Sequence, residues 1–212
     1  MKDIPVFDTE HGVASLILKE IPYRETAYVT IQSSQEPDKL VEECVAFCRM
    51  CGAEKVFASG HTALETRLFH TAMWEMRCLS DALADTDAAL WPIQEETLEI
   101  WRGIYNEKAI HVPNGAWMDT QDAREMLRKG DGYFIHRNGK LLGIGRASGD
   151  MIDWVAATQP GAGRDVVLAL SSLLNSDTVR LLVASANEKA VRLYERMGFL
   201  KVKEISKWYR VL

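Results

Sequence analysis

Residues 151–199 alternate between strand-like and helix-like patterns, with short turns between them. Residues 151–156 and 178–184 are rich in apolar and β-branched side chains, which is typical of strands. Residues 165–174 and 188–197 repeat their apolar side chains with helical spacing. This order of strand, helix, strand and helix predicts an α/β fold with a mixed sheet.

The whole chain predicts two lobes. Small and acidic residues at 82–89 separate an N-terminal α/β lobe, expected over residues 1–86, from a second domain over residues 87–212. The pair Asn138-Gly139 between two apolar runs indicates a tight hairpin. Further helices are expected over residues 38–51, 62–73, 94–105 and 122–128. Further strands are expected over residues 14–18, 27–31, 56–58, 132–135, 140–145 and 199–211.

Charge and hydropathy argue against several classes of protein. The 25 basic and 30 acidic residues give a net charge of -5, without the basic stripe of a nucleic-acid-binding protein. The longest apolar run of the C-terminal half, residues 166–170, is far shorter than the roughly 20 residues of a membrane span. The first residues are soon acidic and do not resemble a secretory signal. Four cysteines without a dispersed disulfide framework then predict a cytoplasmic protein. A monomer or a homodimer is expected.

Cys44, Cys48 and Cys51 have the spacing C-x3-C-x2-C. This spacing resembles the iron–sulfur triad of radical S-adenosylmethionine enzymes. It falls within an amphipathic helical pattern that places the three thiols on one face, where cysteine packs as a small apolar side chain. Cys78 stands alone, and the histidines show no ligand spacing such as H-E-x-x-H. No metal site is therefore predicted.

A turn with the sequence Gly161-Ala162-Gly163 leads from a predicted strand into a predicted helix. Glycines let the backbone turn tightly and approach a ligand with no side chain in between. The first N–H groups of the helix are unpaired, and the helix dipole places partial positive charge behind them. The turn therefore favours an anion such as phosphate. An ordinary strand-to-helix turn is the alternative.

The helix at 188–197 carries a more specific pattern. Asn187 is a suitable N-terminal cap and Gly198 a suitable C-terminal cap. The series N-x-x-A-x-x-L-Y-x-x-x-G-F at residues 187–199, followed by a strand, resembles the closing motif of the GCN5-related N-acetyltransferases (the GNAT superfamily). The resemblance covers about residues 90–212 and implies the GNAT fold there.

The resemblance also implies a site. Acetyl-CoA, or another acyl-CoA, would lie between two parallel strands that separate, residues 152–156 and 180–184. The pantetheine would pair with the strand near Val155. Asn187 matches the family's CoA-contacting asparagine, and Tyr194 matches the tyrosine that protonates the leaving thiolate. The pyrophosphate would lie on Gly161, Ala162, Gly163, Arg164, Asp165 and Val166.

Two residues depart from the family's phosphate loop, which usually reads Gln/Arg-x-x-Gly-x-Gly/Ala. Pro160 stands at the Gln/Arg position and has no N–H to donate. Asp165 stands at the last position of the motif, where the family has glycine or alanine. Its carboxylate lies near the expected phosphate, and the two negative charges repel each other. Gln159 or Arg164 would compensate for these changes.

The reaction that the resemblance implies is direct attack of an amine on the thioester. Tyr194 is the expected acid, since a phenol can donate a proton to the leaving thiolate. The expected base, on the strand before the glycine turn, is Asp153, with Asp150 as the alternative. Glu107 and Asp119, near the first helices of the domain, are weaker candidates, and some relatives use only ordered water. Leu182 occupies the region where some relatives carry a glutamate on the next strand.

We therefore expect an N-acyltransferase with acetyl-CoA as co-substrate, no metal, and a small-molecule or peptide amine as acceptor. A non-catalytic acyl-CoA-binding or scaffold protein on the same fold is the alternative. The first lobe shares the order strand, helix, strand, helix. In this lobe, residues 35–38 occupy the position where a phosphate loop would lie, but they contain no glycine and carry two carboxylates. A degenerate GNAT-like lobe is expected there.

Overall fold

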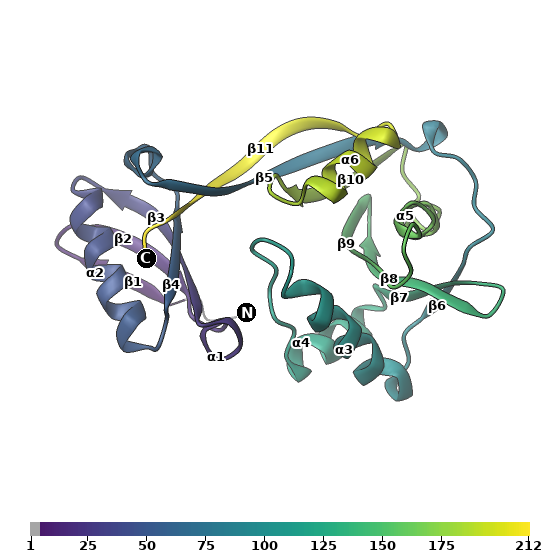
Figure 1. Ribbon diagram of the computed structural model, residues 1–212, viewed down its shortest axis with the longest axis horizontal. Coiled ribbons are helices and arrows are strands. Elements are labelled where there is room, and N and C mark those ends of the chain that lie inside the picture. The colour runs from purple at the N-terminus through teal and green to yellow at the C-terminus, as the bar shows by residue number, and fades with distance from the viewer. Residues whose placement is uncertain (1–4) are drawn as a thin grey trace. The chain divides into compact units, whose positions relative to one another are not determined.

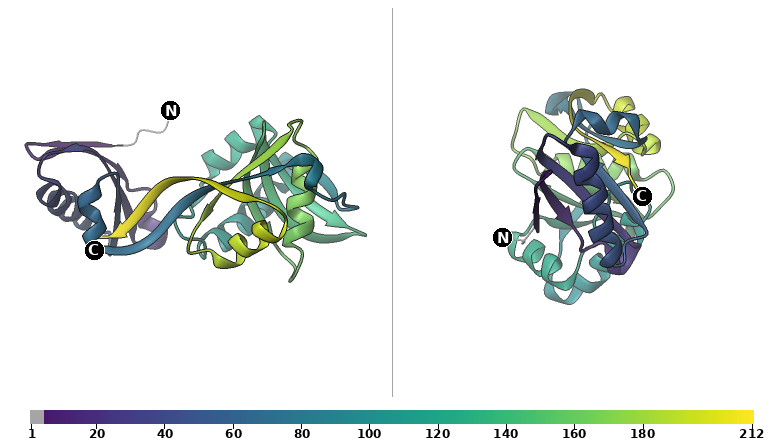
Figure 2. Two further views of the ribbon diagram at one scale, coloured as in Figure 1. Left: turned by 90° about the horizontal axis from the view of Figure 1, so that it is seen from above. Right: turned by 90° about the vertical axis from the view of Figure 1, so that its left-hand side faces the viewer.

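A computed structural model describes residues 5–212 (Figure 1). The chain forms two compact units: residues up to 73 together with 205–212 make unit 1, and residues 74–204 make unit 2. Two long strands, β5 (Leu68–Leu79) and β11 (Leu200–Arg210), belong to both units. They are neighbours in the sheet (Figure 2). β5 leads the chain from unit 1 into unit 2, and β11 leads it back.

Unit 1 is a sheet with α2 (Pro37–Met50) packed on one face. Its strand order is β1-β2-β3-β4-β11. Its other elements are β1 (Val6–Thr9), β2 (Gly12–Ile17), α1 (Ile21–Arg24), β3 (Thr26–Ser34), β4 (Lys55–Ser59) and the 3-10 helix η1 (Thr62–Thr66). The parallel strands β3 and β4 pair without interruption from Thr26 opposite Lys55 to Thr30 opposite Ser59.

The cysteine triad lies at the end of α2, and part of its prediction is wrong. Cys44 and Cys48 are buried in the core of unit 1, but Cys51 is exposed. The helix ends at Met50, so Cys51 lies beyond it and leaves the apolar face. Burial raises the pKa of Cys44 to about 12 and that of Cys48 to about 11, which keeps both thiols protonated and unreactive.

Unit 2 is a sheet with helices on both faces, which confirms the predicted α/β class with a mixed sheet. The strand order is β11-β5-β10-β9-β8-β7-β6. α5 (Gly163–Ser171) packs on one face, and α3 (Leu98–Ala109) and α4 (Thr120–Lys129) pack on the other (Figure 1). The remaining elements are η2 (Ser80–Ala82), β6 (Ala89–Pro92), η3 (Glu95–Thr97), β7 (Gly132–Arg137), β8 (Lys140–Ser148), β9 (Met151–Ala157), β10 (Thr178–Ala184) and α6 (Glu188–Arg196).

Glycines shape the β7–β8 hairpin and its contact with α5. Asn138 and Gly139 both have positive φ, 51° and 74°, which confirms the tight hairpin predicted from this pair. A Cβ at Gly143 would lie 2.6 Å from Val166 Cγ2, and one at Gly145 would collide with Leu170. The two glycines of β8 therefore let α5 lie directly on the sheet.

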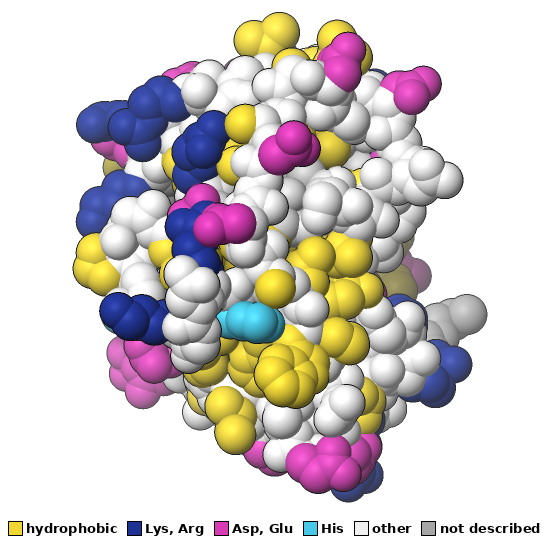
Figure 3. All heavy atoms as spheres, turned by 90° about the vertical axis from the view of Figure 1, so that its right-hand side faces the viewer, with side chains coloured by type: hydrophobic (Ala, Val, Ile, Leu, Met, Phe, Trp, Pro, Cys, Tyr) yellow, Lys and Arg dark blue, Asp and Glu magenta, His cyan; other side chains and the backbone are white. Residues whose placement is uncertain are grey.

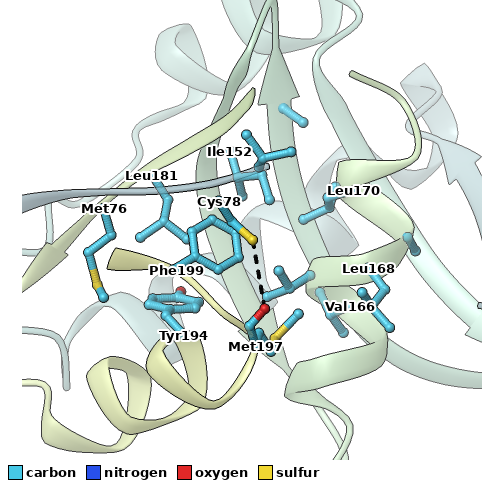
Figure 4. Packing of buried hydrophobic residues seen from close by; sticks show 14 of the residues in the cluster. Met76, Cys78, Ile152, Val166, Leu168, Leu170, Leu181, Tyr194, Met197 and Phe199 are labelled. Carbon is cyan, nitrogen blue, oxygen red and sulfur yellow. Dashed lines mark hydrogen bonds between the residues drawn. The ribbon is translucent and has the colours of Figure 1, made fainter. Parts of the chain in front are cut away.

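The sequence predicts a helix over residues 62–73, and this prediction is wrong. Only η1 is helical there, and β5 follows it. Along β5, Met76 and Cys78 are buried in the core of unit 2 beside Tyr194 and Phe199 (Figure 4). Their neighbours in sequence point to the opposite face, so β5 has the two-residue period of a strand. The strands β1 and β6 also have no counterpart in the prediction.

The edge strand β6 of unit 2 carries an exposed tryptophan. Trp91 is 59% exposed, and its ring centroid lies 5.9 Å from that of His136 on β7. Figure 3 views the molecule from the side on which β6 lies, and apolar side chains gather there beside a histidine. Pro92 ends the strand and has no N–H, which limits pairing of this edge with another strand.

The burial of β5 in unit 2 predicts the effect of one substitution. Met76→Ala removes a side chain that is 1% exposed and should lower the free energy of unfolding by about 2–5 kcal/mol. Met50→Ala, at a site that is 79% exposed, is the control and should change it by less than about 0.5 kcal/mol. Urea denaturation followed by circular dichroism measures both. Equal effects would mean that β5 does not support the core.

Candidate functional site

The parallel strands β9 and β10 separate soon after they meet. They pair only at Met151 opposite Arg180 and Ile152 opposite Leu181. β9 continues to Ala157 and β10 to Ala184, and no pairing between these later residues is found in the described part of the chain. Past Ile152, the edge of β9 that faces β10 has free backbone groups. The corresponding strands of unit 1, β3 and β4, stay paired.

A β-bulge marks the point of separation. Ala147 of β8 is opposite Ile152, and Arg146 is opposite Trp154, so Asp153 is the extra residue on β9. Asp153 accepts a hydrogen bond from the Ser148 hydroxyl at 3.0 Å and is exposed.

The bulge also sets the direction of the side chains. Trp154 packs in the cluster of α3 and α4, with its ring 4.6 Å from that of Tyr105. Ile152 and Val155 lie in the cluster of α5. Ala147 points into the cluster of α5, so the next residue, Ser148, points to the opposite face. The hydrogen bond from Ser148 places Asp153 on that face as well, together with Trp154. The bulge therefore places the consecutive side chains of Asp153 and Trp154 on the face opposite α5.

The turn after β9 offers free backbone donors. Gly161 has φ +82°, which favours glycine. The Ala162 N–H donates to the Gln159 carbonyl at 3.2 Å, and the Val166 N–H donates to the Ala162 carbonyl at 3.1 Å. No acceptor within residues 5–212 is found for the N–H groups of Gly161, Gly163, Arg164 and Asp165. These free donors lie at the positive end of the α5 dipole, a position that favours an anion.

Asp165, in the first turn of α5, is paired with an arginine. It accepts a hydrogen bond from Arg137 Nη1 at 3.1 Å, and the same guanidinium pairs with Asp87. The hydrogen bond to Asp165 raises the pKa of Arg137, so the guanidinium stays positively charged beside the first turn of α5. Sequence reasoning did not find Arg137, because it lies on a distant strand and completes no motif.

Gly163 allows α5 and α6 to come close. A Cβ at Gly163 would lie 3.0 Å from Leu193 Cδ2, a contact tighter than side chains normally make. Asn187 begins α6 as predicted: its Oδ1 accepts a hydrogen bond from the Ala190 N–H at 3.4 Å. Among the residues that the structure describes, none pairs with its Nδ2, which leaves this amide free to donate to a ligand.

Tyr194 is buried on α6 at 7% exposure. Its ring centroid lies 5.8 Å from that of Phe199, and Met76 of β5 lies on its other side (Figure 4). Its hydroxyl has no hydrogen-bond partner within residues 5–212. Burial raises the pKa of Tyr194 to about 12, so the phenol is protonated at neutral pH and can donate.

The topology brings most of the predicted site residues to one edge of the sheet. β9 and β10 are parallel, so their carboxyl ends meet at the same edge. The turn at 158–163 follows one strand, and Asn187 follows the other. Asp153 lies where the strands separate, whereas Asp150 is held at the opposite end, because Arg180 binds it at 2.6 and 2.7 Å and lowers its pKa.

Comparisons with known proteins give similar structures only. No protein-family model and no curated protein match the chain. A functionally unknown conserved protein from Staphylococcus epidermidis is 13% identical, with a TM-score of 0.62 over 99% of this chain and 94% of its own. A GCN5-related N-acetyltransferase from Sphaerobacter thermophilus is 15% identical, with a TM-score of 0.56 over 93% of this chain and 75% of its own.

A tandem GNAT protein from the clavulanic acid biosynthesis pathway is 14% identical, with a TM-score of 0.54 over 95% of this chain and 78% of its own. The chain has the GCN5-related N-acetyltransferase fold. These GNAT neighbours confirm the fold that the motif at residues 187–199 implies. At identities of 13–15%, the likeness is one of fold.

Two further features are absent from residues 5–212. No helix there is both long and apolar enough to cross a membrane. No group of three or more histidine, cysteine or acidic side chains in this range is arranged to hold a metal ion.

The environment of Tyr194 predicts an unusual titration. The ordinary pKa of tyrosine is about 10, so the difference between the alkaline titrations of the protein and of Tyr194→Phe should have its midpoint near pH 12. Between these values the unfolded state loses the proton first, so stability should fall with rising pH more steeply in the unchanged protein. Ultraviolet absorbance of tyrosinate measures the midpoint. A midpoint near 10 would contradict the burial of this hydroxyl.

Proposed function

We propose that the protein is an N-acyltransferase that transfers an acetyl or other short acyl group from acyl-CoA to an amine. The separation of β9 and β10, with free N–H groups following β9 at the same edge, carries this proposal. A gap between parallel strands fits an extended thiol arm, and the free donors fit its pyrophosphate. Structural neighbours named as acetyltransferases support transferase chemistry.

The residues of unit 2 fit acyl-CoA. The N–H groups of Gly161, Gly163, Arg164 and Asp165 would hold the pyrophosphate, and the side chains of Ala162 and Val166 anchor the turn in the core. The backbone of β9 at Val155 would pair with the pantetheine amides, and the Asn187 amide would donate to the same arm. Arg137 offsets the Asp165 carboxylate, the feature of the sequence that most opposed phosphate binding.

The proposed chemistry uses two side chains. Asp153 takes a proton from the acceptor ammonium, and the freed nitrogen attacks the thioester carbonyl carbon. The new C–N bond forms as the C–S bond breaks, and Tyr194 gives a proton to the leaving thiolate sulfur. The site contributes mainly by holding the two reactants together, because proximity removes most of the entropy cost of their encounter. The acceptor is a small-molecule or peptide amine.

The first lobe is proposed to be a degenerate GNAT-like lobe over residues 1–86, before an acyltransferase domain over residues 87–212. The sequence β1, β2, β3, α2 and β4 matches β7, β8, β9, α5 and β10 in order and pairing. In unit 1 the parallel pair stays closed, and α2 begins with Pro37, which has no N–H, between Glu36 and Asp38. The closed pair offers no gap for the pantetheine, and the start of α2 lacks a donor and repels a phosphate, so unit 1 is not expected to bind acyl-CoA. A neighbour described as a tandem GNAT protein supports a two-lobe arrangement.

One observation favours a second candidate, a non-catalytic acyl-CoA-binding protein. Tyr194 is buried with a pKa of about 12, so it is a weak acid unless ligand binding changes its surroundings. Release of CoA thiol with a panel of amines separates the two functions. Free cysteines support the cytoplasm as the proposed compartment. The proposed assembly is a monomer or a homodimer.

Removing one backbone donor tests the anion site. Arg164→Pro deletes an N–H in the first turn of α5, where proline is tolerated and the preceding Gly163 has no Cβ to clash with it. Acetyl-CoA affinity should fall about tenfold or more, the effect of one lost hydrogen bond to a charged group. Arg164→Ala, which keeps the N–H, is the matched control. Calorimetry that finds equal affinity in both variants would exclude this turn as the phosphate site.

Removing the phenol tests the chemistry. Tyr194→Phe should lower turnover by about tenfold to a hundredfold, with acetyl-CoA affinity changed less than about threefold, because the proton donor is lost and the packing is kept. Asp153→Asn should lower turnover similarly. Tyr133→Phe, whose hydroxyl only bonds the Gly130 carbonyl, is the control and should be unaffected. Thiol-release assays measure all three. Undiminished turnover in Tyr194→Phe would remove Tyr194 from the reaction.

A further inference from the structure

Strand β5 brings a carboxylate into unit 2 that the sequence motifs do not include. Glu75 is buried at 8% exposure, and its Oε1 accepts a hydrogen bond from Arg77 Nε at 2.6 Å. Arg180 Nη1 lies 3.8 Å from the same oxygen. No partner of Oε2 is found in the described range 5–212. One oxygen is therefore held by a hydrogen bond from Arg77 and a longer ion pair with Arg180, and the other is available.

Glu75 lies on the same face as the Asp153 bulge. On β5 the alternate residues Met76 and Cys78 enter the core under α5 and α6, so Glu75 points to the other face. On β10, Leu181 enters the same core, so Arg180 also points to the other face. Asp153 was placed on this face by its hydrogen bond to Ser148.

The register of β5 and β10 brings Glu75 to the open part of the sheet. The Ser80 N–H donates to the Asp177 carbonyl, and Arg180 lies near Glu75, so the neighbouring strands β5 and β10 are antiparallel. Counting from Ser80 opposite Asp177 places Glu75 opposite Leu182. Leu182 is the first residue of β10 beyond its pairing with β9.

The two arginines lie on the closed side of Glu75. Arg180 is in the paired part of β10 and is bound to Asp150, and Arg77 is beside it on β5. They hold Oε1 from this side. Leu182, which is 42% exposed, is the cross-strand neighbour on the open side. A carboxylate oxygen without a partner thus stands next to an exposed apolar side chain where β9 and β10 separate.

We propose that Glu75 binds the ammonium group of the acceptor and thereby sets its class: a primary amine on an apolar chain. This inference rests on the proposed acyltransferase function. A carboxylate can accept from a second cation while one of its oxygens is held. Leu182 then contacts the apolar chain, and Asp153, on the same face, takes the proton. Glu75 is a positioning and specificity residue supplied by β5, before the segment that resembles the GNAT family.

Steady-state kinetics of the full chain with acetyl-CoA and hexylamine test this role, with ethanolamine as the polar counterpart. Glu75→Gln should raise the KM for hexylamine at least tenfold, with kcat changed less than threefold and acetyl-CoA affinity unchanged. Glu99→Gln, in an exposed ion pair with Arg102, is the matched control and should leave all three unchanged. The unchanged protein should prefer hexylamine to ethanolamine in kcat/KM.

A second variant separates binding from a structural role. Adding Leu182→Glu to Glu75→Gln restores a carboxylate on the neighbouring strand but removes the Leu182 contact with the apolar chain. It should therefore recover part of the hexylamine affinity and weaken the preference for hexylamine over ethanolamine, which a merely structural defect would not allow. An unchanged KM in Glu75→Gln, no recovery in the double variant, or no acylation of hexylamine by a protein that binds acetyl-CoA would overturn the inference. Failure of the unchanged protein to bind acetyl-CoA would instead count against the proposed function itself.

Discussion

The hydrogen-bond ladder between β9 and β10 ends after Ile152 and Leu181, and the candidate site depends on this interruption. Each strand stays in place because its other edge is held, β9 by β8 and β10 by β5. The bulge at Asp153 turns β9 at the same point. Unpaired backbone groups inside a sheet are normally unfavourable, since each buried polar group needs a partner. An extended ligand with amide groups is the partner that such an opening suits best.

Close packing keeps the opening rigid. Gly143 and Gly145 bring α5 onto β8, and Gly163 brings the start of α5 against Leu193 of α6. These contacts fix the first turn of α5, whose N–H groups point away from the protein's own acceptors. The proposed anion site is therefore formed before any ligand binds, which would reduce the entropy lost on binding.

The C-terminal part of the fold could be predicted from sequence because its signals are local. The Asn138-Gly139 turn, the cap at Asn187 and the alternation of strands and helices each depend on neighbouring residues. The proposed role of Glu75 and the pairing of Arg137 could not be predicted, because they depend on Arg180 and Asp165, which lie on elements distant in sequence. The first residues of β5, 68–73, fall within the helix predicted over residues 62–73 because they share their apolar pattern with η1, and only the surrounding sheet selects the strand.

Unit 1 is built from two parts of the chain that are far apart in sequence. Tyr209 and Arg210 pair with β4, and the backbone of Val56 exchanges hydrogen bonds with Val211 and Leu212. Tyr209 is also part of the unit 1 core. During synthesis on the ribosome, the first unit therefore emerges well before the strand that finishes its sheet. Its β4 edge stays open until unit 2 has been made, so the two units must reach their final state together rather than one after the other.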